Sequence, residues 1–145
     1  MAYNWFRPKG GRFGVAPVVL EATIAPGTNS LTANSTTTYY IPTPYRRLRF
    51  ARAASQCTTV PVDSDGTATA IVYKVVGTDT TALTAALSLE ALTANVAAVF
   101  TSTATEPSRA IAPGNTLKVV VTNSSAAVDT HPVDLKFVVE CEVIN

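Results

Sequence analysis

Short runs in which apolar residues alternate with polar ones recur along this chain, and they constrain its fold more than any other feature. The clearest run covers residues 133–144, where apolar side chains occupy every second position: Val133, Leu135, Phe137, Val139, Cys141 and Val143. Alternation with a period of two places one side of a strand in a core and the other in water. The run therefore predicts a strand with one buried and one wet face.

Other segments have strand composition and are separated by residues that favour turns. They cover residues 15–24, 36–41, 45–53, 67–76, 96–101 and 117–122. Residues 80–99 permit either a helix or a strand, and we expect a short strand followed by a turn or a single helical turn. About eight short strands without a long helix predict an all-β, single-domain, two-sheet β-sandwich. Its topology, jelly-roll or immunoglobulin-like, stays open at this stage.

The segment Asp63-Ser64-Asp65-Gly66 has the Asp-Gly chemistry of a tight turn. Such a turn between two strand-like runs favours a β-hairpin. Its aspartates also resemble the start of a calcium-binding loop, but the twelfth position counted from Asp63 is Lys74 instead of the required glutamate. We therefore interpret the segment as a hairpin turn.

The first fourteen residues have neither a helical nor a strand period, and they are rich in aromatic and basic side chains. These are Tyr3, Trp5, Phe6 and Phe13, with Arg7, Lys9 and Arg12. The composition predicts an extended N-terminal arm over residues 1–14, followed by a sandwich domain over residues 15–145. Aromatic side chains contribute strongly to protein interfaces, so we expect the rings to contact a partner. The alternative is that they fold back over the protein's own core.

The charge is unevenly distributed, although the net charge is only +1. Seven basic residues and one acidic residue precede Ala53, whereas four basic and nine acidic residues follow it. Residues 1–52 thus carry a net charge of +6 (7 − 1), and the rest of the chain carries a net charge of −5 (4 − 9). Complementary surfaces of this kind suit self-assembly or docking to another protein.

Arginines are concentrated at the start of the strand expected over residues 45–53. In this segment Leu48 and Phe50 are expected to point inward, with Arg47 and Arg49 pointing outward. We interpret Arg46, Arg47 and Arg49 as partner-binding residues that form salt bridges with a neighbouring subunit. A solvated strand face and a nucleic-acid patch are the alternatives, and the acidic remainder of the chain argues against the second.

The sequence contains few of the residues and motifs that a catalytic site or a metal site requires. His131 is the only histidine and lies in a polar loop, and there is no glycine-rich phosphate loop or nucleophile motif. Cys57 and Cys141 have no partner at metal-ligand spacing, and we expect two small buried hydrophobic side chains in preference to a disulfide. No apolar stretch approaches the length of a membrane span, and the N-terminus does not resemble a secretion signal. We expect no catalytic residue, cofactor, metal or membrane partner.

Three segments resemble small structural proteins of tailed bacteriophage virions, above all capsid decoration or cement proteins. These segments are TTYYIPTPYRR (37–47), DSDGT (63–67) and APGNTL (112–117). The resemblance extends over most of the chain, as Thr-, Ala- and Val-rich strands with Pro-Gly turns and an aromatic arm.

The resemblance implies a β-sandwich on the outside of a phage head, made in the host cytoplasm and often trimeric, with an arm that grips the major capsid protein. On this interpretation the arm's rings are apolar anchors, and Arg7, Lys9 and Arg12 pair with capsid acids. The alternative is another virion component, such as a head fibre base, a neck or tail protein, or a receptor-binding module. A nucleic-acid-binding protein or an enzyme is less favoured than either of these interpretations.

Overall fold

The computed structural model describes residues 17–22 and 24–144, which form β-strands and turns without a helix. The expected arm over residues 1–14 lies outside the described residues. Most of the long strands form where the sequence has β-branched runs, although the strand over residues 48–56 contains no β-branched residue. The Pro- and Gly-containing segments lie between the long strands. In residues 80–99 the structure has the end of one strand, two strands of two residues each, and turns. The strands are β1 (Pro17–Glu21), β2 (Ser35–Ile41), β3 (Leu48–Gln56), β4 (Ala68–Val76), β5 (Asp79–Ala82), β6 (Leu87–Ser88), β7 (Ala98–Val99), β8 (Ala110–Ile111), β9 (Thr116–Asn123) and β10 (Lys136–Val143).

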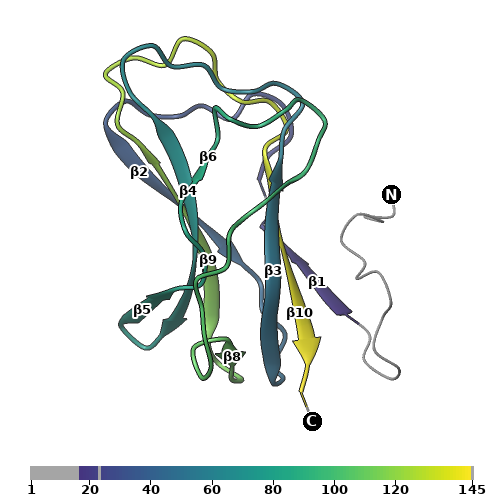
Figure 1. Cartoon of the computed structure of the whole chain (residues 1–145). Coiled ribbons are helices and arrows are strands. Elements are labelled where there is room, and N and C mark those ends of the chain that lie inside the picture. Colours follow the sequence, from purple (N-terminus) through teal and green to yellow (C-terminus); the bar gives the residue numbers. More distant parts are fainter. Residues whose placement is uncertain (1–16, 23, 145) are drawn as a thin grey trace.

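Two antiparallel sheets pack face to face, as the sequence predicts (Figure 1). Sheet A has the order β1-β10-β3-β7, with β8 also paired to β3. Sheet C has the order β2-β9-β4-β5, with β6 also paired to β4. The described part of the chain is thus an all-β, two-sheet sandwich.

The pairing of the strands is nested, and this settles the topology that the sequence left open. The first strand pairs with the last, β2 with β9, β3 with β7 and β8, and β4 with β5 and β6. Successive strands β1 to β4 alternate between the two sheets. A long antiparallel ribbon rolled up in this way is a jelly roll.

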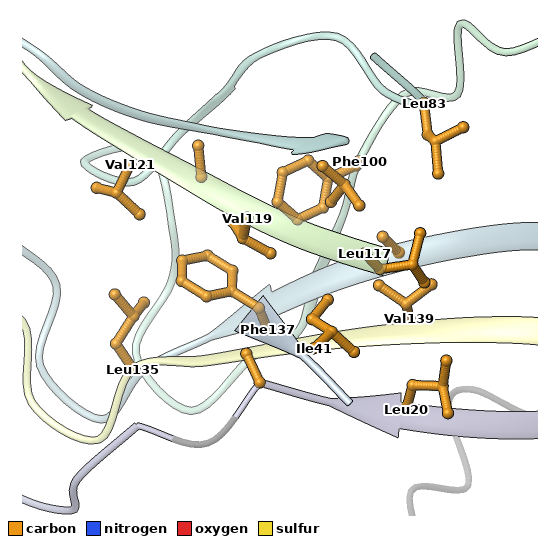
Figure 2. Close-up of a cluster of buried hydrophobic side chains, with 14 of the residues drawn as sticks. Leu20, Ile41, Leu83, Phe100, Leu117, Val119, Val121, Leu135, Phe137 and Val139 are labelled. Atoms are coloured by element: carbon orange, nitrogen blue, oxygen red, sulfur yellow. The ribbon is translucent and has the colours of Figure 1, made fainter. Parts of the chain in front are cut away.

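The core lies between the sheets and draws on both of them (Figure 2). Leu48 and Phe50 point inward from β3, as expected. Phe137 of β10 lies near the centre, with its ring centroid 5.8 Å from that of Tyr39 and 6.5 Å from that of Phe100. Tilted aromatic pairs at such separations add stabilisation to the burial of their apolar area. Alternation therefore predicted the inward positions of Leu48, Phe50 and Phe137 correctly.

The segment Asp63–Gly66 is a turn, but the prediction of a hairpin is wrong. The strands before and after it, β3 and β4, belong to different sheets. The turn packs instead against residues 124–125, so closely that a Cβ atom on Gly66 would come within 2.8 Å of the Ser125 backbone. Glycine is needed here for close approach between two connections, which a local sequence pattern does not reveal.

The prediction that β10 has a wet outer face is also wrong in its central part. Val138 and Glu140 point away from the core, yet only 2% and 3% of their surfaces are exposed. Strand β10 lies between β1 and β3, so neighbouring strands flank its outward side chains on both sides. Val138 contacts the outward-facing Ala54 of β3 in a small apolar cluster outside the main core. The outer face of sheet A therefore contains a small buried apolar cluster among its charged residues.

Candidate protein-docking surface

The sequence-predicted partner-binding residues fall into two groups, of which the structure describes one. Arg46, Arg47 and Arg49 lie in and next to the connection from β2 to β3. The others lie outside the described residues: Tyr3, Trp5, Phe6, Arg7, Lys9, Arg12 and Phe13.

The connection between β2 and β3 presents an exposed basic and aromatic surface. Pro42 and Pro44 end β2, because proline cannot donate a ladder hydrogen bond. Tyr45 follows with 86% of its surface exposed, and Arg46 and Arg47 are also exposed. The backbone is held in place, since the amide of Ile144 donates to the carbonyl of Arg47 at 3.1 Å. We call Tyr45, Arg46, Arg47 and Ile144 the arginine patch.

Arg49 differs from the two preceding arginines, because it forms ion pairs within its own chain. Its Nε lies 2.5 Å from Glu106 Oε1, and its Nη1 lies 3.8 Å from Glu142 Oε2. All three side chains are partly exposed, so each ion pair contributes little to stability. Arg46 and Arg47 of the arginine patch are therefore more available to a partner than Arg49 is.

Arg52 reaches the same outer face as Arg49 because β3 contains a β-bulge. The register with β10 shifts so that Phe50 pairs with Cys141 and Arg52 with Glu140, which leaves Ala51 as the extra residue. Arg52 Nε lies 3.1 Å from the buried Glu140 carboxylate. The sequence pattern did not predict this pair, because a bulge changes which side chains share a face.

Two further basic side chains, Arg109 and Lys74, donate hydrogen bonds to backbone carbonyls and so stabilise the fold. Arg109 donates to the carbonyl oxygens of Phe50 and Ala51 at the bulge, at 3.0 and 3.3 Å. Lys74 points inward from β4, and its ammonium group donates to the carbonyls of Ser108 and Ala110 at 2.7 and 2.9 Å. These contacts hold the connection around β8 to both sheets.

The arginine patch lies at the end of the sandwich where the described chain begins. Pro17 of β1 pairs with Glu142 of β10, which pairs with Arg49 of β3. Adjacent strands are about 4.8 Å apart, so Pro17 lies about 10 Å from the start of β3. The C-terminus reaches the same end, near β8 (Figure 1). The aromatic and basic residues 1–16 are thus attached next to the arginine patch.

The outer face of sheet C is a second exposed surface, which the sequence did not single out. Tyr40 of β2, Lys118 of β9 and Tyr73 of β4 form one row across three strands. The Lys118 ammonium lies 6.0 Å from the centroid of the Tyr73 ring, within the range of a cation–π contact. Tyr40 is strongly exposed at the edge of the sheet.

His131 and the two cysteines have structural positions in the described part of the chain. His131 is part of the loop structure, since its Nδ1 accepts a hydrogen bond from the amide of Leu31 at 3.1 Å. Cys57 and Cys141 are both free and buried, and burial raises the pKa of each thiol, that of Cys141 to about 12. No cluster of three or more metal-ligating side chains occurs within residues 17–22 and 24–144.

The chain matched no protein-family model, no curated protein and no solved structure. Within the part of the chain that the structure describes, no helix is long and apolar enough to cross a membrane. The fold and surface define a jelly-roll sandwich with an exposed basic and aromatic end.

Proposed function

We propose that this protein is a non-enzymatic virion structural protein that binds the outside of a phage capsid and stabilises it. The observation that carries the proposal is the position of the arginine patch. Tyr45, Arg46 and Arg47 are exposed beside Pro17, to which the aromatic and basic N-terminal segment is attached. The N-terminal segment is therefore attached at the end of the sandwich that carries side chains of the same chemistry.

The chemistry of this end fits an acidic protein surface. Residues 1–16 contain Arg7, Lys9 and Arg12 and no acidic residue, and the arginine patch adds Arg46 and Arg47. Opposite charges steer the partners together, and aromatic anchors then supply most of the binding energy. On the resemblance to decoration proteins, the partner would be the major capsid protein or another virion protein.

A trimer would strengthen such binding. Three linked copies engage a symmetric site together, so the second and third contacts form at high effective concentration. A protein that binds only the assembled shell stabilises that shell by mass action. Both effects require protein contacts alone, without a cofactor, nucleic acid or membrane.

The second candidate is another virion component, such as a head fibre base, a neck or tail protein, or a receptor-binding module. The row of Tyr40, Lys118 and Tyr73 on sheet C favours it, because exposed aromatic side chains with a polar end are enriched at binding surfaces. In this case the partner would contact sheet C, and the arginine patch would not be required.

The test is the composition of assembled particles. Particles purified by density gradient from phage lysates that contain this chain should carry it at a fixed ratio to the major shell protein, set by the shell's symmetry. Particles stripped of the chain should disassemble at a lower temperature and regain stability when it is added back. A chain that is absent from purified particles, or present only in tails, would refute the capsid proposal.

A further inference from the structure

Apolar side chains lie at the centre of the outer face of sheet A, next to charged residues such as Glu140 and Arg52. Ala54 and Val138 form an apolar cluster there, outside the main core. Val19 of β1 and Val99 of β7 also point outward, next to Glu140 and Ala54 respectively. An antiparallel sheet with one face in water normally carries polar residues on that face, so these four apolar side chains are an exception within an otherwise polar surface.

A groove with a volume of about 800 Å³ lies at one end of this outer face. Its apolar side includes Ile24, Pro26, Val96 and Val99, and Cys57 and Leu135 are buried among its lining residues. Glu21, Asp134 and Lys136 also line it and give a net charge of −1 (1 − 2). This volume is in the range of about 300–1,000 Å³ that is typical of ligand pockets, with an apolar lining and few polar groups.

We propose that this groove and the adjoining outer face of sheet A are the docking site for residues 1–16 of the same chain. The segment carries Tyr3, Trp5, Phe6 and Phe13, whose rings match the apolar lining. Its three basic residues match the net negative charge of the groove. A flat surface of a second copy would leave a hollow of this volume unfilled, whereas a segment with projecting rings fills it.

The position of β1 allows this docking. The strand runs from Pro17, beside Glu142, to Glu21, beside Val138 and at the edge of the groove. A segment that precedes Pro17 must reverse direction and return about 13 Å, the length of four strand residues. Gly14 stands three residues before Pro17, and glycine accepts the backbone angles that a reversal requires. Sixteen extended residues reach about 50 Å, so the groove is within reach.

Attachment to the same sheet also favours docking within one molecule. A short tether gives its segment an effective concentration of the order of millimolar, far above the protein concentration in most experiments. The inference goes beyond the proposed function, because it assigns a site to the aromatic segment in the isolated protein. A capsid would then compete with this groove for the same rings.

Fluorescence of Trp5, the only tryptophan, tests the proposal directly in the full chain. Emission should be blue-shifted and protected from acrylamide, and neither property should change with protein concentration. Val96→Asp places a charge on the exposed apolar side of the groove, and it should reduce the docked population about tenfold, with a red shift. Val96→Leu preserves the apolar surface and should keep the emission of the unaltered protein.

The matched control is Val76→Asp, which introduces the same charge on sheet C. Val76 is 46% exposed and Val96 is 52% exposed, so the two substitutions have a similar effect on solvent contact. Val76→Asp should leave Trp5 emission unchanged.

Emission typical of exposed tryptophan in the unaltered protein, or equal effects of the two substitutions, would overturn the proposal. A blue shift that develops only as concentration rises would overturn docking within one chain and indicate exchange between copies. Binding to phage particles is measured in a separate experiment, so the docking of residues 1–16 and the capsid-binding function can each be refuted without the other.

Discussion

Replacing Arg52 by alanine should destabilise the sandwich much more than the same change at Arg49. Arg52 Nε lies 3.1 Å from Glu140 Oε2, and only 4% of the Glu140 side chain is exposed. Two unit charges about 4 Å apart attract by about 4 kcal/mol at an effective dielectric constant of 20. The Arg52 side chain is 33% exposed, so water offsets part of this attraction when the arginine is removed. We expect Arg52→Ala to cost about 2 kcal/mol, because it leaves a buried carboxylate without this partner.

The cost is measured by urea unfolding, supported by thermal melting, where a loss of about 2 kcal/mol lowers the Tm by roughly 6–8 °C in a chain of this size. Adding Glu140→Gln to Arg52→Ala removes the buried charge and should restore much of the stability. A double-mutant cycle isolates the coupling between the two residues. Arg49→Ala is the matched control and should cost less than about 1 kcal/mol, because its ion pairs are exposed. Equal costs for Arg52→Ala and Arg49→Ala would refute the reasoning.

Three other substitutions or conditions test separate parts of the structure. Gly66→Ala should destabilise the protein by about 2 kcal/mol or more, since its Cβ would come within 2.8 Å of the Ser125 backbone; an unchanged urea midpoint would show that this approach is not tight. Cys57 and Cys141 should react with a thiol reagent only after unfolding, because burial raises the pKa of both thiols and suppresses the reactive thiolate. Stability should also fall as pH rises above about 8.5, where the unfolded thiols ionise before the folded ones; a flat alkaline profile would contradict this. Glu90→Gln should raise the Tm at neutral pH but not below the ordinary glutamate pKa of about 4.3, because burial and nearby Asp63 raise the pKa of Glu90 and make its charged form unfavourable in the fold. An equal gain at both pH values would point to a cause other than charge.

The inward residues of the sandwich were predictable, because a strand's period of two is a local property of the sequence. Alternation placed Leu48, Phe50 and Phe137 in the core, where the structure has them. The choice between jelly-roll and immunoglobulin-like topology depends on which distant strands pair, such as β1 with β10. No local pattern encodes that pairing.

The docking surface was predictable only in part, for the same reason. The sequence grouped Arg46, Arg47 and Arg49 because they are neighbours in the chain. Ion pairs to Glu106 and Glu142, both distant in sequence, separate Arg49 from the other two in the structure. The buried partner of Arg52 and the tight approach at Gly66 also depend on distant segments. The prediction of an aromatic arm lies outside the described residues and stays a prediction.

The most direct test of the central claim is whether the N-terminal segment is needed for particle binding. Intact protein and a variant lacking residues 1–14 are mixed with shells stripped of the chain, and the bound fraction is measured by co-sedimentation. Circular dichroism first confirms that the truncated sandwich is folded. We expect the truncated protein to bind at least about tenfold more weakly, because it has lost the aromatic anchors Tyr3, Trp5, Phe6 and Phe13. Equal binding by both proteins would contradict it.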